Sequence, residues 1–174
     1  MSTDTRVHLS ERFDGSRVGL VHQVNVSRGG VPKLPVAAAE VGEGGLSGDR
    51  QRNRRVHGGP MRAVCLYSFE VIERLRAEGH PIVPGATGEN LTVSGLDWSL
   101  VHPGVRLRVG DTVLLEVTRF TAPCENIAPA FLQGEFPRIA VQHAPFESRV
   151  YARVLATGSV RSGDPVEIVA QERR

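Results

Sequence analysis

Apolar and polar residues alternate along several short segments of the chain, which is the pattern of half-buried β-strands. The clearest segment runs from Thr112 to Phe120 and follows the dipeptide Gly110-Asp111. Because a Gly-Asp pair between two alternating segments is typical of a tight turn, residues 105–120 are predicted to form a β-hairpin. Other strands are predicted at residues 18–27, 34–41, 63–67, 149–156 and 165–169, and residues 88–93 run into another.

One longer segment has the spacing of an amphipathic helix. We expect this helix over residues 69–78, with Ser68 as its N-cap and Gly79 at its end. Two shorter helices are expected at residues 129–133 and 138–142. Many short strands combined with few helices favour a mainly β fold with helical insertions, and the regular spacing of the strands indicates an antiparallel barrel.

The length of 174 residues and the hydrophobic fraction of 40% suit one domain with a hydrophobic core. We predict that this domain spans residues 18–170, between a flexible start at 1–17 and a polar tail at 171–174. The net charge of +2 gives no case for a nucleic-acid partner, and no apolar run reaches membrane-spanning length. With two cysteines and no apolar leader segment, we expect a cytoplasmic protein without membrane contacts.

The longest segment without a strand or helix pattern, residues 42–60, is rich in glycine and arginine. Glycine lets the backbone approach a ligand closely, and arginine binds phosphate, so this loop is either a solvated basic segment or an anion pocket. Within it, Asp49-Arg50 forms either an internal ion pair or part of a site, and His57 lies either in a turn or beside a ligand. Glu89-Asn90 likewise either caps a strand or binds a ligand rich in heteroatoms.

Cys124 is the strongest candidate for chemistry, although a packed or merely exposed thiol is the alternative. It follows the strand predicted at 112–120, so the strand would fix its position while the loop leaves it accessible. The six histidines lack ligand spacing, which argues against zinc, and only His143 lies downstream for a cysteine–histidine nucleophile. Cys65 lies within an apolar run and is interpreted as a buried small hydrophobe.

Several motifs follow one another in a fixed order, and the order carries more weight than any motif alone. They are Gly48-Asp49-Arg50, His57-Gly58-Gly59-Pro60, Arg62-Ala63-Val64, Gly85 with Gly88-Glu89-Asn90-Leu91, Pro123-Cys124, Ser148-Arg149-Val150-Tyr151 and Gly163-Asp164. In this order the chain resembles the MOSC family, named for the C-terminal domain of molybdenum cofactor sulfurase. The resemblance extends over roughly residues 18–169 and is that of a stand-alone MOSC domain.

The resemblance implies a MOSC-type β-barrel, similar to the barrel domain of pyruvate kinase, and a molybdenum cofactor, which is a pterin dithiolene bearing a phosphate. In catalytic members a cysteine thiolate ligates the metal, and the matching residue is Cys124; a soft thiolate suits such a metal. The resemblance further implies cofactor contacts from Asp49, Arg50, His57, Arg62, Glu89 and Asn90. Of these, Arg50 and Arg62 would bind the phosphate. Pyridoxal phosphate binding is implied only for the family at large.

Known members reduce small N-hydroxylated substrates such as hydroxylaminopurines and amidoximes, so the resemblance implies this activity. The chain has no flavin motif and no iron–sulfur cysteine set, so a separate electron-transfer protein is expected as a partner. Two alternatives stay open. One is a sulfur carrier or cofactor-handling module with a persulfide on Cys124, and the other is a ligand-binding barrel without catalysis. Met61 replaces an acid found in many relatives and favours the last alternative.

Overall fold

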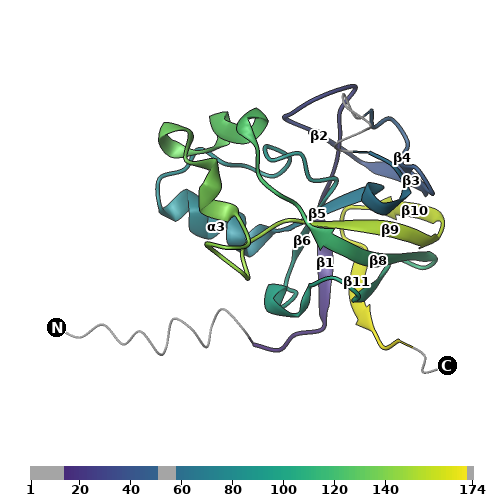
Figure 1. Ribbon diagram of the computed structural model, residues 1–174. Coiled ribbons are helices and arrows are strands. Elements are labelled where there is room, and N and C mark those ends of the chain that lie inside the picture. Colours follow the sequence, from purple (N-terminus) through teal and green to yellow (C-terminus); the bar gives the residue numbers. More distant parts are fainter. Residues whose placement is uncertain (1–13, 51–57, 172–174) are drawn as a thin grey trace.

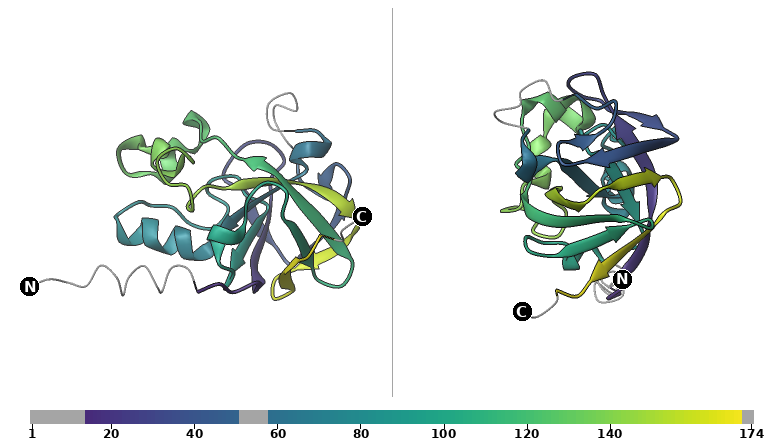
Figure 2. Two further views of the ribbon diagram at one scale, coloured as in Figure 1. Left: turned by 60° about the horizontal axis from the view of Figure 1, so that its bottom comes forward. Right: turned by 90° about the vertical axis from the view of Figure 1, so that its right-hand side faces the viewer.

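The computed structural model of the protein describes residues 14–50 and 58–171 (Figure 1). Its strands are β1 (Val18–Val26), β2 (Leu34–Val36), β3 (Ala38–Gly42), β4 (Gly45–Leu46), β5 (Val64–Ser68), β6 (Leu91–Ser94), β7 (Arg106–Val109), β8 (Val113–Phe120), β9 (Val150–Ala156), β10 (Gly158–Arg161) and β11 (Pro165–Val169). Strands β1-β11-β7-β8-β9-β5-β6 pair in this order, and β6 pairs with β1 again. This closure forms a β-barrel, seen from two further sides in Figure 2. The predicted mainly β class with helical insertions is confirmed.

The barrel is not antiparallel throughout, so that part of the sequence prediction is wrong. β5 and β6 run parallel, with Leu66 opposite Leu91. Parallel neighbours need a long crossover connection, and here the crossover contains α3 (Phe69–Ala77), which follows β5 directly. Alternation within a segment predicts a strand, but it holds no information about the direction of the strand's neighbour.

A second sheet has three strands in the order β10-β3-β4. Sequence patterns miss two of them, because β4 falls inside the loop expected at 42–60 and β10 begins at Gly158, directly behind the strand predicted at 149–156. The strand expected at 34–41 is divided at Ala37 into β2, which pairs with β1, and β3, which pairs with β10. The pairing of β3 with β10 joins segments from opposite ends of the chain, and such long-range pairing is invisible to local patterns.

Alternation along the barrel strands sends one set of side chains to the interior. In β8, Val113, Leu115 and Val117 are buried, and the residues between them are half-buried. Burial of such a side chain stabilises the fold by roughly 1.5–3 kcal/mol. Trp98 is buried at the edge of this core, and its indole N–H donates to the carbonyl of Ser148 at 2.8 Å. The only tryptophan of the chain is therefore a reporter of folding.

The helix expected after Ser68 is confirmed as α3. The Ser68 hydroxyl accepts a hydrogen bond from the Val71 N–H at 3.3 Å, which satisfies one of the free donors at the helix start. Val71, Ile72 and Leu75 form the buried face of the helix. α3 thus covers the barrel directly beside the parallel β5–β6 pair.

The connection between β8 and β9 contains an insertion, residues 125–147, whose 3-10 helices are Glu125–Ala130, Leu132–Gly134 and Phe136–Ile139. The short helices expected at 129–133 and 138–142 correspond to 3-10 helices, whose bounds differ from the expected ones. Pro129 and Pro137 lack a backbone N–H, which favours short turns over a regular α-helix. The insertion, green in Figure 1, lies on the same side as α3 in both figures. Across residues 14–50 and 58–171, no helix is long and apolar enough to cross a membrane.

Candidate functional site

One rim of the barrel brings several strand ends into a single layer. Phe120 at the end of β8 lies opposite Val150 at the start of β9. Leu66 in β5 pairs with Val150 on one side and with Leu91, the first residue of β6, on the other. Val24, near the end of β1, also pairs with Leu91. The segments that flank these positions therefore surround one space, although they are far apart in sequence.

A cavity of about 650 Å³ lies at this rim, a volume typical of small-molecule and cofactor sites. The polar and thiol-bearing residues on its wall are Lys33, Arg50, Cys65, Thr87, Asn90, Thr121, Cys124, Asn126, Arg149 and Tyr151. Among the described residues that line it, three are cationic and none is an aspartate or glutamate. The wall therefore presents positive charge and two thiols to a ligand.

Cys124 lines this cavity from the segment that follows β8, which is where the sequence places it. The residue is half-buried and directly precedes the 3-10 helix Glu125–Ala130. Its segment is fixed at the strand end, because the Thr121 N–H donates to the carbonyl of Arg149 at 2.9 Å. The thiol is thus both positioned and accessible, while its role as a metal ligand stays a prediction.

Cys65 lines the same cavity, a position that the sequence did not indicate. Its predicted burial is confirmed at 5% exposure, and its Sγ lies 3.8 Å from the hydroxyl of Thr121. Burial raises the pKa of the Cys65 thiol, and it raises the pKa of Tyr151 to about 12, although Arg149 acts in the opposite direction on both groups. Cys65 and Tyr151 therefore keep their protons at neutral pH.

Asp49 and Asn90 meet in one polar network at the cavity wall. Asp49 Oδ2 accepts from Lys33 Nζ at 2.6 Å and from Asn90 Nδ2 at 2.9 Å. Asn90 Oδ1 accepts from the Cys65 N–H at 3.0 Å. One sequence hypothesis paired Asp49 with Arg50, but the ion pair that forms is with Lys33, which sequence reasoning missed. The network joins the loop around residue 49 to the start of β6.

Glu89 is adjacent to Asn90 but does not line the cavity. Its carboxylate is fully buried and accepts hydrogen bonds from the Gly85 N–H at 2.7 Å, the Thr87 hydroxyl at 2.7 Å and the Thr92 hydroxyl at 3.1 Å. Three donors satisfy the buried carboxylate and hold the turn before β6 together. This geometry favours the structural alternative for Glu89, and its contact with a cofactor stays a prediction.

The arginines expected to bind phosphate are separated in the structure. Arg50 is exposed and lines the cavity. Arg62 belongs to the 3-10 helix Pro60–Arg62 and does not line the cavity, but its guanidinium lies 5.9 Å from the ring centroid of Tyr151, which does. Arg62 therefore contacts a residue of the wall through that ring. His57 lies outside the described residues.

Arg149 lines the cavity with 5% exposure, and sequence reasoning gave it no role beyond its place in a motif. It directly precedes the buried residues Val150, Tyr151 and Ala152 at the start of β9. An arginine directly before a buried strand is unusual, because charged side chains are rarely buried without a partner. That position is the sequence signal that could have drawn attention to it.

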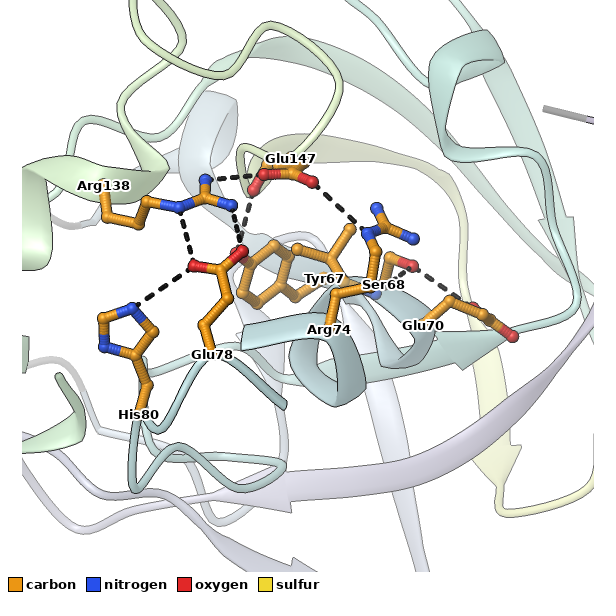
Figure 3. A network of polar contacts seen from close by, with 9 residues as sticks. Tyr67, Ser68, Glu70, Arg74, Glu78, His80, Arg138 and Glu147 are labelled. Carbon is orange, nitrogen blue, oxygen red and sulfur yellow. Dashed lines mark hydrogen bonds and ion pairs between the residues drawn. The ribbon is translucent and has the colours of Figure 1, made fainter. Parts of the chain in front are cut away.

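Ion pairs anchor the insertion to α3 and its C-terminal end, and a hydrogen bond anchors it to β5 (Figure 3). Arg138 of the insertion binds Glu78, which follows α3, at 2.8 Å and Glu147 at 2.6 Å. Glu147 also binds Arg74 of α3 at 3.3 Å, and its carbonyl accepts from the Tyr67 hydroxyl at 2.8 Å. The hydrogen bonds from Arg138 lower the pKa of Glu78, so the carboxylate is held in its charged form. These charged contacts hold the C-terminal part of the insertion against α3.

The protein is a closed β-barrel with a cavity at its rim, and the wall of this cavity combines cationic side chains with two thiols. The family model for the MOSC domain matches residues 53–167. The chain therefore belongs to the MOSC domain family, as the order of its motifs indicated. The match is shorter at its N-terminal side than the range 18–169 suggested by those motifs.

Three comparisons show known proteins to which the chain is similar. Protein YiiM from Escherichia coli K12 is 32% identical over 131 residues, which are 73% of this chain and 57% of YiiM. A protein named reductase from Gibberella moniliformis is 33% identical over 131 residues, 72% of this chain and 22% of that protein. The crystal structure of YiiM from Geobacillus stearothermophilus has a TM-score of 0.67 at 26% identity, covering 87% of this chain and 75% of that one. The chain thus spans less than two thirds of either curated relative.

Proposed function

We propose that this protein is a molybdenum-cofactor-binding oxidoreductase that reduces N-hydroxylated compounds such as hydroxylaminopurines or amidoximes. The observation that carries the proposal is a half-buried thiol, Cys124, on the wall of a cation-lined cavity in a MOSC barrel. Similarity to the fungal protein named reductase supports the oxidoreductase class. The two free thiols suit a reducing compartment such as the cytoplasm.

The residues on the cavity wall fit the cofactor. A molybdenum cofactor combines a metal that binds thiolate with a phosphate that carries negative charge. Cys124 supplies the thiol, and Lys33, Arg50 and Arg149 supply positive charge on the same wall. Arg149 Nε is buried and has no hydrogen-bond partner among the described residues, so the hydrogen bonds of this guanidinium are incomplete. In this proposal Cys124 ligates the metal, and Arg50 binds the phosphate from the exposed side.

When bound, the cofactor supplies the two electrons that, with two protons, convert an N–OH group to N–H and water. The residues of the chain orient the substrate and hold protons. The Tyr151 hydroxyl stays protonated because its pKa is raised to about 12, so it can donate a hydrogen bond from the wall. The Cys65 thiol also keeps its proton and so does not compete with Cys124 as a thiolate ligand. In this proposal the electrons come from a redox partner, because the two cysteines of this sequence cannot supply the ligands of an iron–sulfur cluster.

The first experiment is a measurement of molybdenum and pterin in protein from a host that makes the cofactor. We expect about one molybdenum per chain in the wild type and in Cys65→Ala, and loss of the metal in Cys124→Ser. Both variants are compared with the wild type by circular dichroism. Reduction of a hydroxylaminopurine should disappear together with the metal.

Two other outcomes would contradict the proposal. Metal content and turnover that survive in Cys124→Ser would show that this thiol is not the ligand. Absence of metal and pterin from the wild type would instead favour sulfur transfer, which uses the same accessible thiol as a persulfide. Sulfur released from the protein by cyanide, and lost in Cys124→Ser, would then identify the persulfide.

A further inference from the structure

Arg149 is a buried cation whose hydrogen bonds are incomplete. One terminal nitrogen donates to the carbonyl of Thr87, and the other lies 3.5 Å from the carbonyl of Ala122. Its Nε has no hydrogen-bond partner in the described part of the chain. A guanidinium has five N–H donors and is always charged, so two neutral carbonyls satisfy only part of it.

The described residues include no carboxylate within ion-pair distance of Arg149. The buried acid connected to it is Glu89, and the connection runs through Thr87. The Thr87 carbonyl accepts from Arg149, while the Thr87 hydroxyl donates to Glu89 at 2.7 Å. A buried charge without a direct partner is unfavourable. The carbonyls therefore fix the guanidinium in place and leave its charge available to a ligand.

The remaining charges around the cavity add to this effect. Lys33 is paired with Asp49, and Arg50 is exposed at the cavity, but no acidic side chain lines the wall. An anion that enters the cavity is thus attracted by a positive potential. The attraction is strongest where water is excluded, because the local dielectric constant is lower there. We propose that Arg149 is the centre of an anion-binding subsite in this cavity and takes a phosphate or carboxylate group of the ligand. Paired guanidinium donors match both groups.

This inference deepens the proposed function and rests on it only for the identity of the ligand. On that function, the anionic group belongs either to the cofactor or to the substrate. The inference also adds a buried cation to the assignment implied by the family resemblance, in which Arg50 and Arg62 bind phosphate. Arg62 does not line the cavity and Arg50 is exposed, whereas Arg149 is buried and lines it.

The test is calorimetric titration of the cofactor-free full chain with inorganic phosphate, in a phosphate-free buffer of low ionic strength. We expect saturable binding to the wild type and an affinity at least about tenfold weaker in Arg149→Met, which is the effect of losing one charge-assisted contact. Arg149→Lys should show an intermediate loss of affinity, because lysine keeps the charge but lacks the paired N–H donors of the guanidinium. The matched control is Arg153→Gln, in the strand β9 that Arg149 directly precedes. Arg153 binds Glu116 at 2.7 Å and does not line the cavity, so its loss should leave phosphate binding unchanged.

Fluorescence of Trp98 establishes that each variant is folded, because the Trp98 indole N–H donates a hydrogen bond to the carbonyl of Ser148, the residue before Arg149. If Arg149→Met does not fold, the phosphate affinity of Arg149→Lys is the test of the inference. Equal phosphate affinity in the wild type and in the folded Arg149 variants overturns the inference, as does a folded wild type that does not bind phosphate. Titration of cofactor-loaded protein then assigns the source. Loss of phosphate binding there assigns the subsite to the cofactor, and retained binding assigns it to the substrate. Absence of molybdenum would refute the proposed function without changing the phosphate result.

Discussion

Cys65 of β5 and Tyr151 of β9 lie directly opposite each other in an antiparallel pair, and both line the cavity that Cys124 lines from its loop. The two cysteines share one cavity but differ in exposure. Cys65 is buried, whereas Cys124 is half-buried. Since burial raises the pKa of the Cys65 thiol and the thiolate is the reactive form, the two thiols should differ strongly in reactivity.

We predict that one thiol per chain reacts rapidly with an aromatic disulfide reagent at neutral pH in the folded protein, and that both react after unfolding in urea. The rapid reaction should be absent from Cys124→Ser and present in Cys65→Ala. Absorbance of the released thiolate measures both rates. A rapid phase that survives in Cys124→Ser would contradict the assignment of the accessible thiol.

The elements that sequence patterns predict well are those fixed by neighbouring residues. The hairpin of β7 and β8 forms around Gly110, with Val109 opposite Val113, because turn chemistry and alternation are local. The start of α3 at Ser68 is likewise a local cap. The parallel β5–β6 pair and the sheet that contains β10 depend on segments far apart in the chain, so no local pattern indicates them.

The candidate site divides in the same way. Cys124 could be selected because it follows a strong strand and enters a loop, and the structure places it at the cavity. Cys65 could not be selected, because an apolar run predicts a buried strand without showing which side chains face an internal space. Lys33 was missed because its partner, Asp49, is brought to it by the folding of two loops.

The network around Asp49 should be important for stability. Its carboxylate accepts from Lys33, from Asn90 and from the Ser27 N–H at 2.9 Å, and the Lys33–Asp49 pair is 8% and 5% exposed. Asp49→Asn leaves the Lys33 ammonium buried without a counter-charge. We expect a loss of about 3–5 kcal/mol in the free energy of unfolding. Urea denaturation, followed by Trp98 fluorescence, measures this change.

A double-variant cycle tests whether the unpaired charge is the cause. Lys33→Met combined with Asp49→Asn removes both charges, so the double variant should be less destabilised than the sum of the two single variants. Additive losses would show that Lys33 and Asp49 act independently. In that case the hydrogen bonds to Asn90 and Ser27 would account for the effect of Asp49.

The insertion should loosen in acid. The hydrogen bonds from Arg138 lower the pKa of Glu78 in the folded protein. A lowered pKa means that the ion pair stabilises the fold above the unfolded-state pKa, about 4.3, and that this contribution is lost as the pH falls through the folded-state pKa. Arg138→Gln should therefore reduce stability at pH 7, by about 1 kcal/mol, with a smaller difference from the wild type at about pH 3.

Urea unfolding at both pH values checks this prediction, and Arg76→Gln is the control. Arg76 pairs with Glu73 on α3, with side chains that are 53% and 47% exposed. Such a surface pair contributes little, so the control should resemble the wild type at either pH. An Arg138→Gln deficit that stays constant between the two pH values would show that Arg138 acts through packing rather than through charge.

Glu89→Gln separates the two roles considered for Glu89. The carboxylate accepts three hydrogen bonds, so the amide should lower the free energy of unfolding by about 1–3 kcal/mol. The same substitution removes the buried negative charge joined through Thr87 to Arg149. Affinity for inorganic phosphate should therefore rise, roughly threefold or more, while stability falls. Calorimetry and urea unfolding measure the two changes. A fall in both would show that Glu89 acts on the anion site by shaping the turn, and the charge argument for Arg149 would then be wrong.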